Sequence, residues 1–231
     1  MSRETPTARQ ADEGETTMPE SASVTDFHHA FTNGHGSAAR TTLLMLHGTG
    51  GDEHDLVPLA RALLPGAAIL APRGRVLENG MSRFFRRLRE GVFDEEDLRV
   101  RTAELADWVR AALAAYDLDP DGLVAVGFSN GANIAASLHL LEPRLLPASV
   151  LIRAMVPLQP STPPELHGVA TFLAGGRLDP MIPAVETERL ATMLASYGAD
   201  VTTHWEPGGH GLAAGDVAAA QSWLSRRAPR G

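Results

Sequence analysis

The sequence contains no cysteine, which excludes disulfide bonds, thiolate metal sites and a cysteine nucleophile. It also has no excess of positive charge, because the formal net charge is −8 at pH 7, spread along 231 residues. That balance argues against a nucleic-acid-binding surface. Long hydrophobic runs are missing too: the longest, residues 42–47 and 67–72, are far too short to span a bilayer. We therefore expect neither nucleic-acid binding nor membrane insertion.

The amino-terminal segment lacks the features of a signal and of a folded domain. Its first six residues have no apolar core of the secretory kind, so we expect a cytoplasmic protein. Residues 1–24 contain five acidic residues, two arginines and no aromatic residue, without a periodic apolar face. Such a segment buries too little apolar surface to offset its ordering entropy. We predict a disordered tail over 1–24 and one domain over 25–231.

The rest of the chain alternates between apolar runs and amphipathic segments. Apolar runs predict buried strands over 43–47, 67–71, 123–127, 149–152 and 169–174, and a further strand is predicted over 200–205. Apolar residues at helical spacing predict helices over 56–64, 100–116, 132–141 and 190–197, and one from 216 onward. This alternation predicts an α/β fold whose mostly parallel central sheet has helices on both faces. Ligands of such sheets bind at the carboxyl ends of the strands.

The pentapeptide Gly127-Phe128-Ser129-Asn130-Gly131 lies between a predicted strand and a predicted helix. A Gly-x-Ser-x-Gly at such a corner is typical of a nucleophile elbow, whose tight turn leaves the serine oxygen exposed. The positive end of the following helix favours negative charge at the same place. We predict that Ser129 is a nucleophile rather than a filler of a glycine-rich loop.

An acid and a base follow the elbow in the chain. Asp179 lies in the turn after the strand 169–174, and His210 lies in the glycine-rich segment 207–211 after the strand 200–205. A carboxylate can hold a histidine in the tautomer that accepts a serine proton. The order Ser, Asp, His is that expected of α/β-hydrolases. We predict a triad of Ser129, Asp179 and His210, although an Asp before Pro180 is also common in simple turns.

The segment His47-Gly48-Thr49-Gly50-Gly51 ends the first predicted strand. We predict that the backbone N–H groups of Thr49 and Asn130 form an oxyanion hole. Phosphate binding is disfavoured because neither a Gly-Lys-Ser/Thr nor a Gly-x-Gly-x-x-Gly pattern is present. A metal site is also disfavoured, since the spacing of the acidic residues and histidines matches no common site; these are His47, Asp52, His54 and Asp55.

One basic cluster stands out, and two interpretations of it stay open. It consists of four arginines with Phe84 and Phe85 among them: Arg73, Arg83, Arg86 and Arg87. The cluster could recognise an acidic group on a substrate. It could equally be a solvated face paired with the acidic run 94–97.

Several segments together resemble the phospholipase/carboxylesterase family of bacterial α/β-hydrolases. Within it, the resemblance is to hydrolases linked to methylhydroquinone and catechol resistance. The matching stretches cover roughly residues 42–212: Leu46-His-Gly-Thr-Gly-Gly51, Arg73-Gly-Arg-Val-Leu-Glu-Asn-Gly80, Arg83-Phe-Phe-Arg-Arg87, Glu90-Gly-Val-Phe-Asp-Glu95, Gly127-Phe-Ser-Asn-Gly-Ala-Asn-Ile-Ala-Ala136, Met155-Val-Pro157 and His204-Trp-Glu206.

The resemblance implies the same triad and oxyanion donors, and an esterase that acts on short or compact carboxylic esters without a cofactor. It also implies a homodimer. It favours a substrate site shaped by the segment 73–95, for which we name Arg83 and Phe84, together with Met155. Ester or lactone products of aromatic catabolism, quinone-derived esters and thioesters are chemically open substrates. The alternatives are a thioesterase or lysophospholipase, and a binding module without catalysis on a hydrolase fold.

Overall fold

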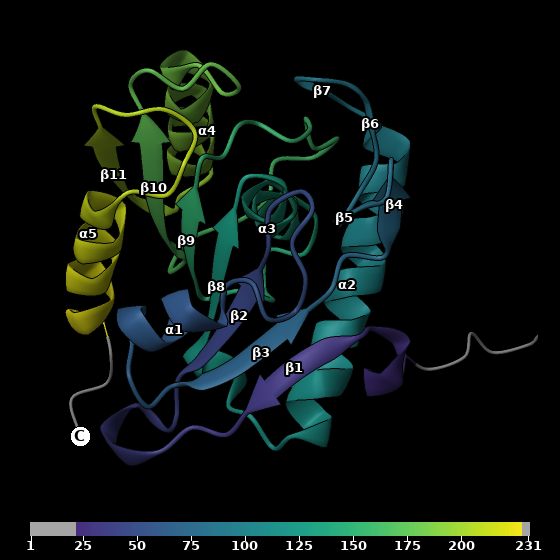
Figure 1. Cartoon of the computed structure of the whole chain (residues 1–231), viewed down its shortest axis with the longest axis vertical. Coiled ribbons are helices and arrows are strands. Elements are labelled where there is room, and N and C mark those ends of the chain that lie inside the picture. Colours follow the sequence, from purple (N-terminus) through teal and green to yellow (C-terminus); the bar gives the residue numbers. More distant parts are fainter. Residues whose placement is uncertain (1–21, 228–231) are drawn as a thin grey trace, which may run out of the picture.

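The computed structural model describes residues 22–227, and its centre is a seven-stranded sheet (Figure 1). The strand order is β1-β3-β2-β8-β9-β10-β11. Six strands are parallel, and β1 alone runs antiparallel, against β3. The bounds are His29–Thr32 (β1), Thr42–Leu46 (β2), Ala68–Pro72 (β3), Leu123–Phe128 (β8), Ala148–Ile152 (β9), Ala170–Gly176 (β10) and Asp200–Glu206 (β11). These six parallel strands match the six that the sequence predicts.

Helices cover both faces of this sheet and create two apolar cores. Helices α1 (Val57–Leu63) and α5 (Ala214–Ser225) pack on one face. Helices α2 (Glu95–Ala115), α3 (Asn130–Leu141) and α4 (Ala184–Ser196) pack on the other. The central strands β2 and β3 are buried at every position, as expected of parallel strands covered on both sides. The predicted fold class, an α/β-hydrolase fold, is confirmed.

Five short strands are not predicted from the sequence. Two small hairpins follow β3, namely β4 (Val76–Glu78) with β5 (Met81–Arg83) and β6 (Arg87–Arg89) with β7 (Val92–Phe93). The fifth is β1, where Phe31 stacks on Tyr116 with ring centroids 3.9 Å apart. Strands of two to four residues are too short to show a period of two, so their partners in space determine them.

The folded domain begins slightly before the predicted boundary at residue 25. Ser23 caps a short 3-10 helix over Val24–Asp26. The carbonyl oxygen of Val24 accepts a hydrogen bond of 2.9 Å from the Trp108 indole on α2. Residues 22–24 therefore belong to the domain, because they are anchored to α2. The rest of the predicted tail, residues 1–21, lies outside the described part of the chain and stays a prediction.

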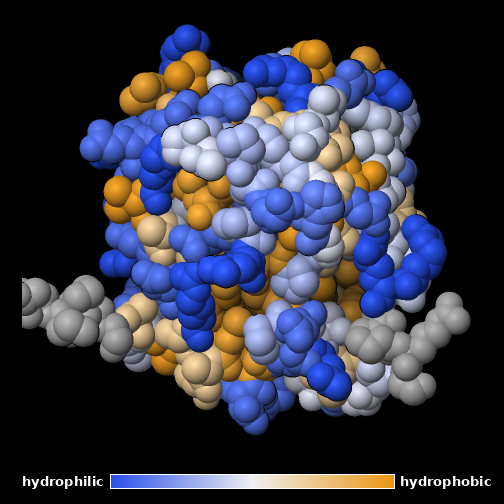
Figure 2. Space-filling model, turned by 180° about the vertical axis from the view of Figure 1, so that it is seen from behind, coloured by the Kyte–Doolittle hydropathy of each residue, from blue (hydrophilic) through white to orange (hydrophobic). Residues whose placement is uncertain are grey.

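Hydrophilic residues cover much of the face seen in Figure 2, with smaller apolar areas between them, most visibly in its lower middle. None of the helices within residues 22–227 combines the length and apolar character needed to cross a membrane.

A histidine inside the core should make the fold sensitive to acid. His139 on α3 is fully buried, and its Nε2 lies 2.8 Å from the Ser149 hydroxyl. Burial lowers the pKa of His139 from 6.5 to about 4. Between these two values the unfolded chain binds a proton that the folded chain does not, so stability is complete above pH 6.5 and falls as the pH drops toward 4.

We expect the free energy of unfolding to fall by about 2 kcal/mol from this group between pH 6.5 and 4.5. Urea unfolding at pH 7.5 and 4.5 measures the decline, with His139→Leu compared with the wild type. The variant should lose stability less steeply with acid, whereas the exposed His28→Leu should not change the slope. Equal slopes in wild type and His139→Leu would contradict the prediction.

Candidate active site

Ser129 lies at the corner between β8 and α3 with φ 52° and ψ −112°. This backbone conformation is strained for a residue with a side chain and holds the predicted nucleophile at the tip of the turn. The two flanking glycines are required by close contacts. A Cβ on Gly127 would lie 2.6 Å from the Ala132 Cα, and one on Gly131 would lie 1.9 Å from the Leu46 carbonyl oxygen.

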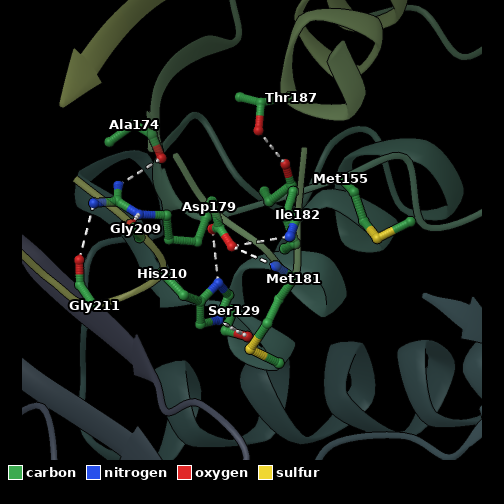
Figure 3. A network of polar contacts seen from close by, with 12 residues as sticks. Ser129, Met155, Ala174, Asp179, Met181, Ile182, Thr187, Gly209, His210 and Gly211 are labelled. Carbon is green, nitrogen blue, oxygen red and sulfur yellow. Dashed lines mark hydrogen bonds and ion pairs between the residues drawn. The ribbon is translucent and has the colours of Figure 1, made fainter. Parts of the chain in front are cut away.

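The structure brings the three predicted triad residues into one hydrogen-bonded row (Figure 3). His210 Nδ1 lies 2.8 Å from Asp179 Oδ2, and His210 Nε2 lies 2.9 Å from Ser129 Oγ. A carboxylate only accepts hydrogen bonds, so Nδ1 carries the proton and Nε2 of the neutral ring accepts from the serine. The other oxygen, Asp179 Oδ1, accepts from the N–H groups of Met181 at 2.8 Å and Ile182 at 3.0 Å.

The acid and the base meet because their strands are neighbours. Strands β10 and β11 run parallel from Ala170↔Asp200 to Gly176↔Glu206, so their loops leave the sheet side by side. Backbone hydrogen bonds join these loops: Arg177 N–H donates to Glu206 O at 2.8 Å, and Leu178 N–H donates to Gly208 O at 3.1 Å. The sheet register thus sets the distance between Asp179 and His210.

Arg153 fixes the histidine loop, a role the sequence does not reveal. Its buried guanidinium forms a bidentate ion pair with Asp216 on α5, at 2.8 and 3.1 Å. It also donates to the carbonyl oxygens on both sides of His210, those of Gly209 at 3.0 Å and Gly211 at 2.9 Å. Arg153 itself has a left-handed backbone with φ 57°. Its side chain therefore serves the loop rather than the substrate cavity.

The predicted oxyanion residues both line the cavity that contains Ser129. Within residues 22–227 neither the Thr49 N–H nor the Asn130 N–H donates to another protein group. Side-chain contacts hold both residues in place: Arg83 Nη1 donates to Thr49 Oγ1 at 2.6 Å, and Asn130 Oδ1 accepts from the Phe84 N–H at 2.7 Å. Both predicted donors are thus held in the cavity beside Ser129 without a protein acceptor among the described residues.

His47 holds in place the segment 47–51, which is predicted to supply an oxyanion donor. One ring nitrogen donates to the Gly48 carbonyl at 2.6 Å, and the other accepts from the Gly74 N–H at 2.9 Å. Burial lowers the pKa of His47, which keeps the ring neutral and able to accept. Both nitrogens are therefore engaged, which leaves none for a metal ion.

The described residues place three candidate metal ligands within reach of one another, but at another location: His204, Glu206 and Asp216. There Asp216 already binds Arg153. The group of His47, Asp52, His54 and Asp55 is not brought together as a set of ligands.

The cavity at Ser129 is small, about 40 Å³, and a groove of about 410 Å³ adjoins it. Gly91, Met155 and Met181 line both spaces, so they form the connection between them. Arg83 and Met155 line the cavity, as predicted for substrate contacts. Phe84 does not: it is buried in the apolar core, with its ring 4.7 Å from that of His47. The prediction of a Phe84 contact is corrected: Phe84 lies in the bend after β5, where both it and Phe85 pack into the apolar core.

The comparisons with known proteins agree with this geometry. The model of the phospholipase/carboxylesterase family matches residues 28–227. The hydrolase MhqD of Bacillus subtilis is 45% identical over 181 residues, which cover 78% of this chain and 90% of that protein.

Solved structures agree. A Bacillus cereus carboxylesterase has a TM-score of 0.84 at 45% identity, covering 87% of this chain and 94% of that one. A protein of unknown function from Agrobacterium tumefaciens has a TM-score of 0.80 at 36% identity, covering 89% and 98%. The chain belongs to the phospholipase/carboxylesterase family of α/β-hydrolases.

Proposed function

We propose that this hydrolase is a serine carboxylesterase that cleaves short or compact esters through an acyl-enzyme. The observation that carries the proposal is the row of hydrogen bonds from Ser129 through His210 to Asp179, at 2.9 and 2.8 Å. A serine hydroxyl is unreactive at neutral pH unless a base removes its proton during attack. His210 is oriented for this task because Asp179 holds its Nδ1 proton.

In the proposed reaction Ser129 Oγ attacks the ester carbonyl carbon while its proton moves to His210 Nε2. The tetrahedral oxyanion binds the N–H groups of Thr49 and Asn130, each worth about 3 kcal/mol in chemistry of this kind. Asp179 stabilises the imidazolium that forms. His210 then protonates the departing alcohol. In the second half of the reaction His210 removes a proton from a water molecule, which attacks the acyl carbonyl carbon. Ser129 Oγ leaves and takes that proton back from His210, which releases the carboxylic acid.

The size of the cavity supports the choice of substrate. About 40 Å³ at Ser129 suits a small group at the scissile carbonyl, and the adjoining groove of about 410 Å³ can hold a further part of the molecule. Compact esters and lactones, including those formed in aromatic catabolism or quinone detoxification, fit this arrangement. The homodimer and the cytoplasmic location remain predictions.

Labelling with a fluorophosphonate probe tests the proposal directly. We expect one covalent adduct, mapped by peptide mass spectrometry to Ser129, and turnover of p-nitrophenyl acetate and butyrate that the probe abolishes. Probe added to heat-unfolded protein is the control, because an unactivated serine should not react. A folded protein that neither labels nor turns over esters would contradict the proposal and favour a binding module on a hydrolase fold.

A further inference from the structure

Two arginines that take no direct part in the proposed chemistry line the cavity beside Ser129. Arg83 ends β5 and is buried, with 3% of its surface exposed, whereas Arg87 begins β6 and is partly exposed. Both contact the carboxylate of Glu78 on β4: Arg83 Nε lies 3.2 Å from Oε2, and Arg87 Nε lies 2.7 Å from Oε1. One carboxylate therefore faces two guanidinium groups. These three groups together give this wall of the cavity one net positive charge.

The same two arginines keep donors free. Arg87 Nε donates to Glu78 Oε1, whereas Arg83 Nε donates to the Phe85 carbonyl oxygen at 3.1 Å and lies within ion-pair distance of Glu78. Arg83 Nη1 donates to Thr49 Oγ1 at 2.6 Å. Within residues 22–227, Arg83 Nη2 and both Nη atoms of Arg87 donate no hydrogen bond. Buried or half-buried guanidinium groups normally have acceptors for these protons.

Asn130, a third residue that lines this cavity, also has a donor without an acceptor. The Asn130 side chain is buried, and its Oδ1 accepts from the Phe84 N–H at 2.7 Å, which sets the orientation of the amide. Its Nδ2 consequently carries the donor protons, and it has no hydrogen-bond partner among the described residues. The wall of the cavity is thus rich in donors and short of acceptors.

Other charges near the wall do not remove this imbalance. Burial lowers the pKa of Arg83, the charge of Arg87 lowers it further, and Glu78 acts in the opposite direction. The remaining acid at the cavity is Glu90, which is exposed and forms no ion pair within the described part of the chain. Solvent screens an exposed carboxylate of this kind, so it neutralises the wall only weakly.

We propose that Arg83 and Arg87 form a subsite for a carboxylate of the substrate, so that the preferred substrates are esters that bear a second, ionised acid group. The planar carboxylate matches the forked donors of a guanidinium, and it would supply both the missing acceptors and the missing negative charge. This inference rests on the proposed esterase function and names its substrate class. Two kinds of ester satisfy it: half-esters of dicarboxylic acids, and esters whose alcohol part carries the acid.

Matched substrate pairs distinguish these two kinds. Monoethyl glutarate is compared with ethyl 4-carbamoylbutanoate, and 4-acetoxybenzoate with 4-acetoxybenzamide. Within each pair an amide replaces the carboxylate. Values of kcat/KM, measured by pH-stat at low salt, are divided by the rate of alkaline hydrolysis of the same ester to remove intrinsic reactivity. We expect the acid member of one pair to be preferred by about tenfold, and the preference to shrink as salt is added.

Three variants show where the preference originates. Arg87→Gln should lower the acid-to-amide ratio of kcat/KM about tenfold. Glu90→Gln should raise the ratio, because it removes a competing negative charge at the rim. Arg89→Gln, two residues along the same strand and outside the cavity lining, removes the same charge as Arg87→Gln and should leave the ratio unchanged.

The possible results separate the subsite from the esterase activity. Turnover without a preference for either acid would overturn the subsite and leave the esterase intact. So would a preference that survives Arg87→Gln, since the carboxylate would then bind elsewhere. Failure of every ester to react, together with absence of fluorophosphonate labelling, would overturn the proposed function and the subsite with it.

Discussion

Replacing Ser129 by alanine is expected to lower kcat on short esters about 10⁶-fold. The change removes the nucleophile, and without it neither His210 nor the oxyanion donors can form an acyl-enzyme. The hydroxyl makes one side-chain hydrogen bond within the described residues, to His210, so the fold should persist. Single-turnover kinetics with p-nitrophenyl butyrate measure the loss, and circular dichroism with thermal unfolding checks the fold.

Ser137→Ala is the matched control for this variant. Ser137 lies on the same helix, and its buried hydroxyl donates to the Asn133 carbonyl oxygen at 2.9 Å, away from the nucleophile. Its loss should cost about 1 kcal/mol of stability and leave kcat close to that of the wild type. A folded Ser129→Ala protein that keeps more than a few per cent of the activity would rule out Ser129 as the nucleophile.

Replacing Asp179 by asparagine should lower kcat about 10⁴-fold, for a reason that the geometry makes specific. The N–H groups of Met181 and Ile182 both donate to Asp179 Oδ1, so an asparagine must keep its oxygen on that side. Its NH₂ group then faces His210 Nδ1 and can only donate. The ring is forced to carry its proton on Nε2, where it no longer accepts a proton from Ser129.

The Asp179→Asn variant keeps the size of the side chain and two of its three hydrogen bonds, so its effect should fall on kcat more than on stability. Kinetics with p-nitrophenyl acetate and urea unfolding measure the two separately. Asp107→Asn on the exposed surface of α2 is the control and should change neither. If Asp179→Asn retained a tenth or more of wild-type kcat, another group would have to orient His210.

Much of this molecule could be predicted from local patterns in the sequence. Five of the six parallel strands are short apolar runs, and such runs report burial on both faces of a sheet. The sixth, β11, lies at the sheet edge and is only partly buried. The elbow is equally local, because a sharp turn from a strand into a helix needs small residues at 127 and 131. Once the elbow is placed, the positions of Asp179 and His210 after later strands indicate the same edge of the sheet.

The contacts that position these groups follow from tertiary structure alone. Arg153 reaches Asp216, 63 residues along the chain, and no periodicity connects two such residues. The hairpins β4–β5 and β6–β7 are too short to show a pattern, yet they bring Arg83 and Arg87 to the cavity. They also direct Phe84 into the core. Local sequence determined the main strands and helices and the chain order of the predicted triad. Packing between distant segments decided which neighbouring side chains line the cavity, because that choice depends on partners that lie far away along the chain.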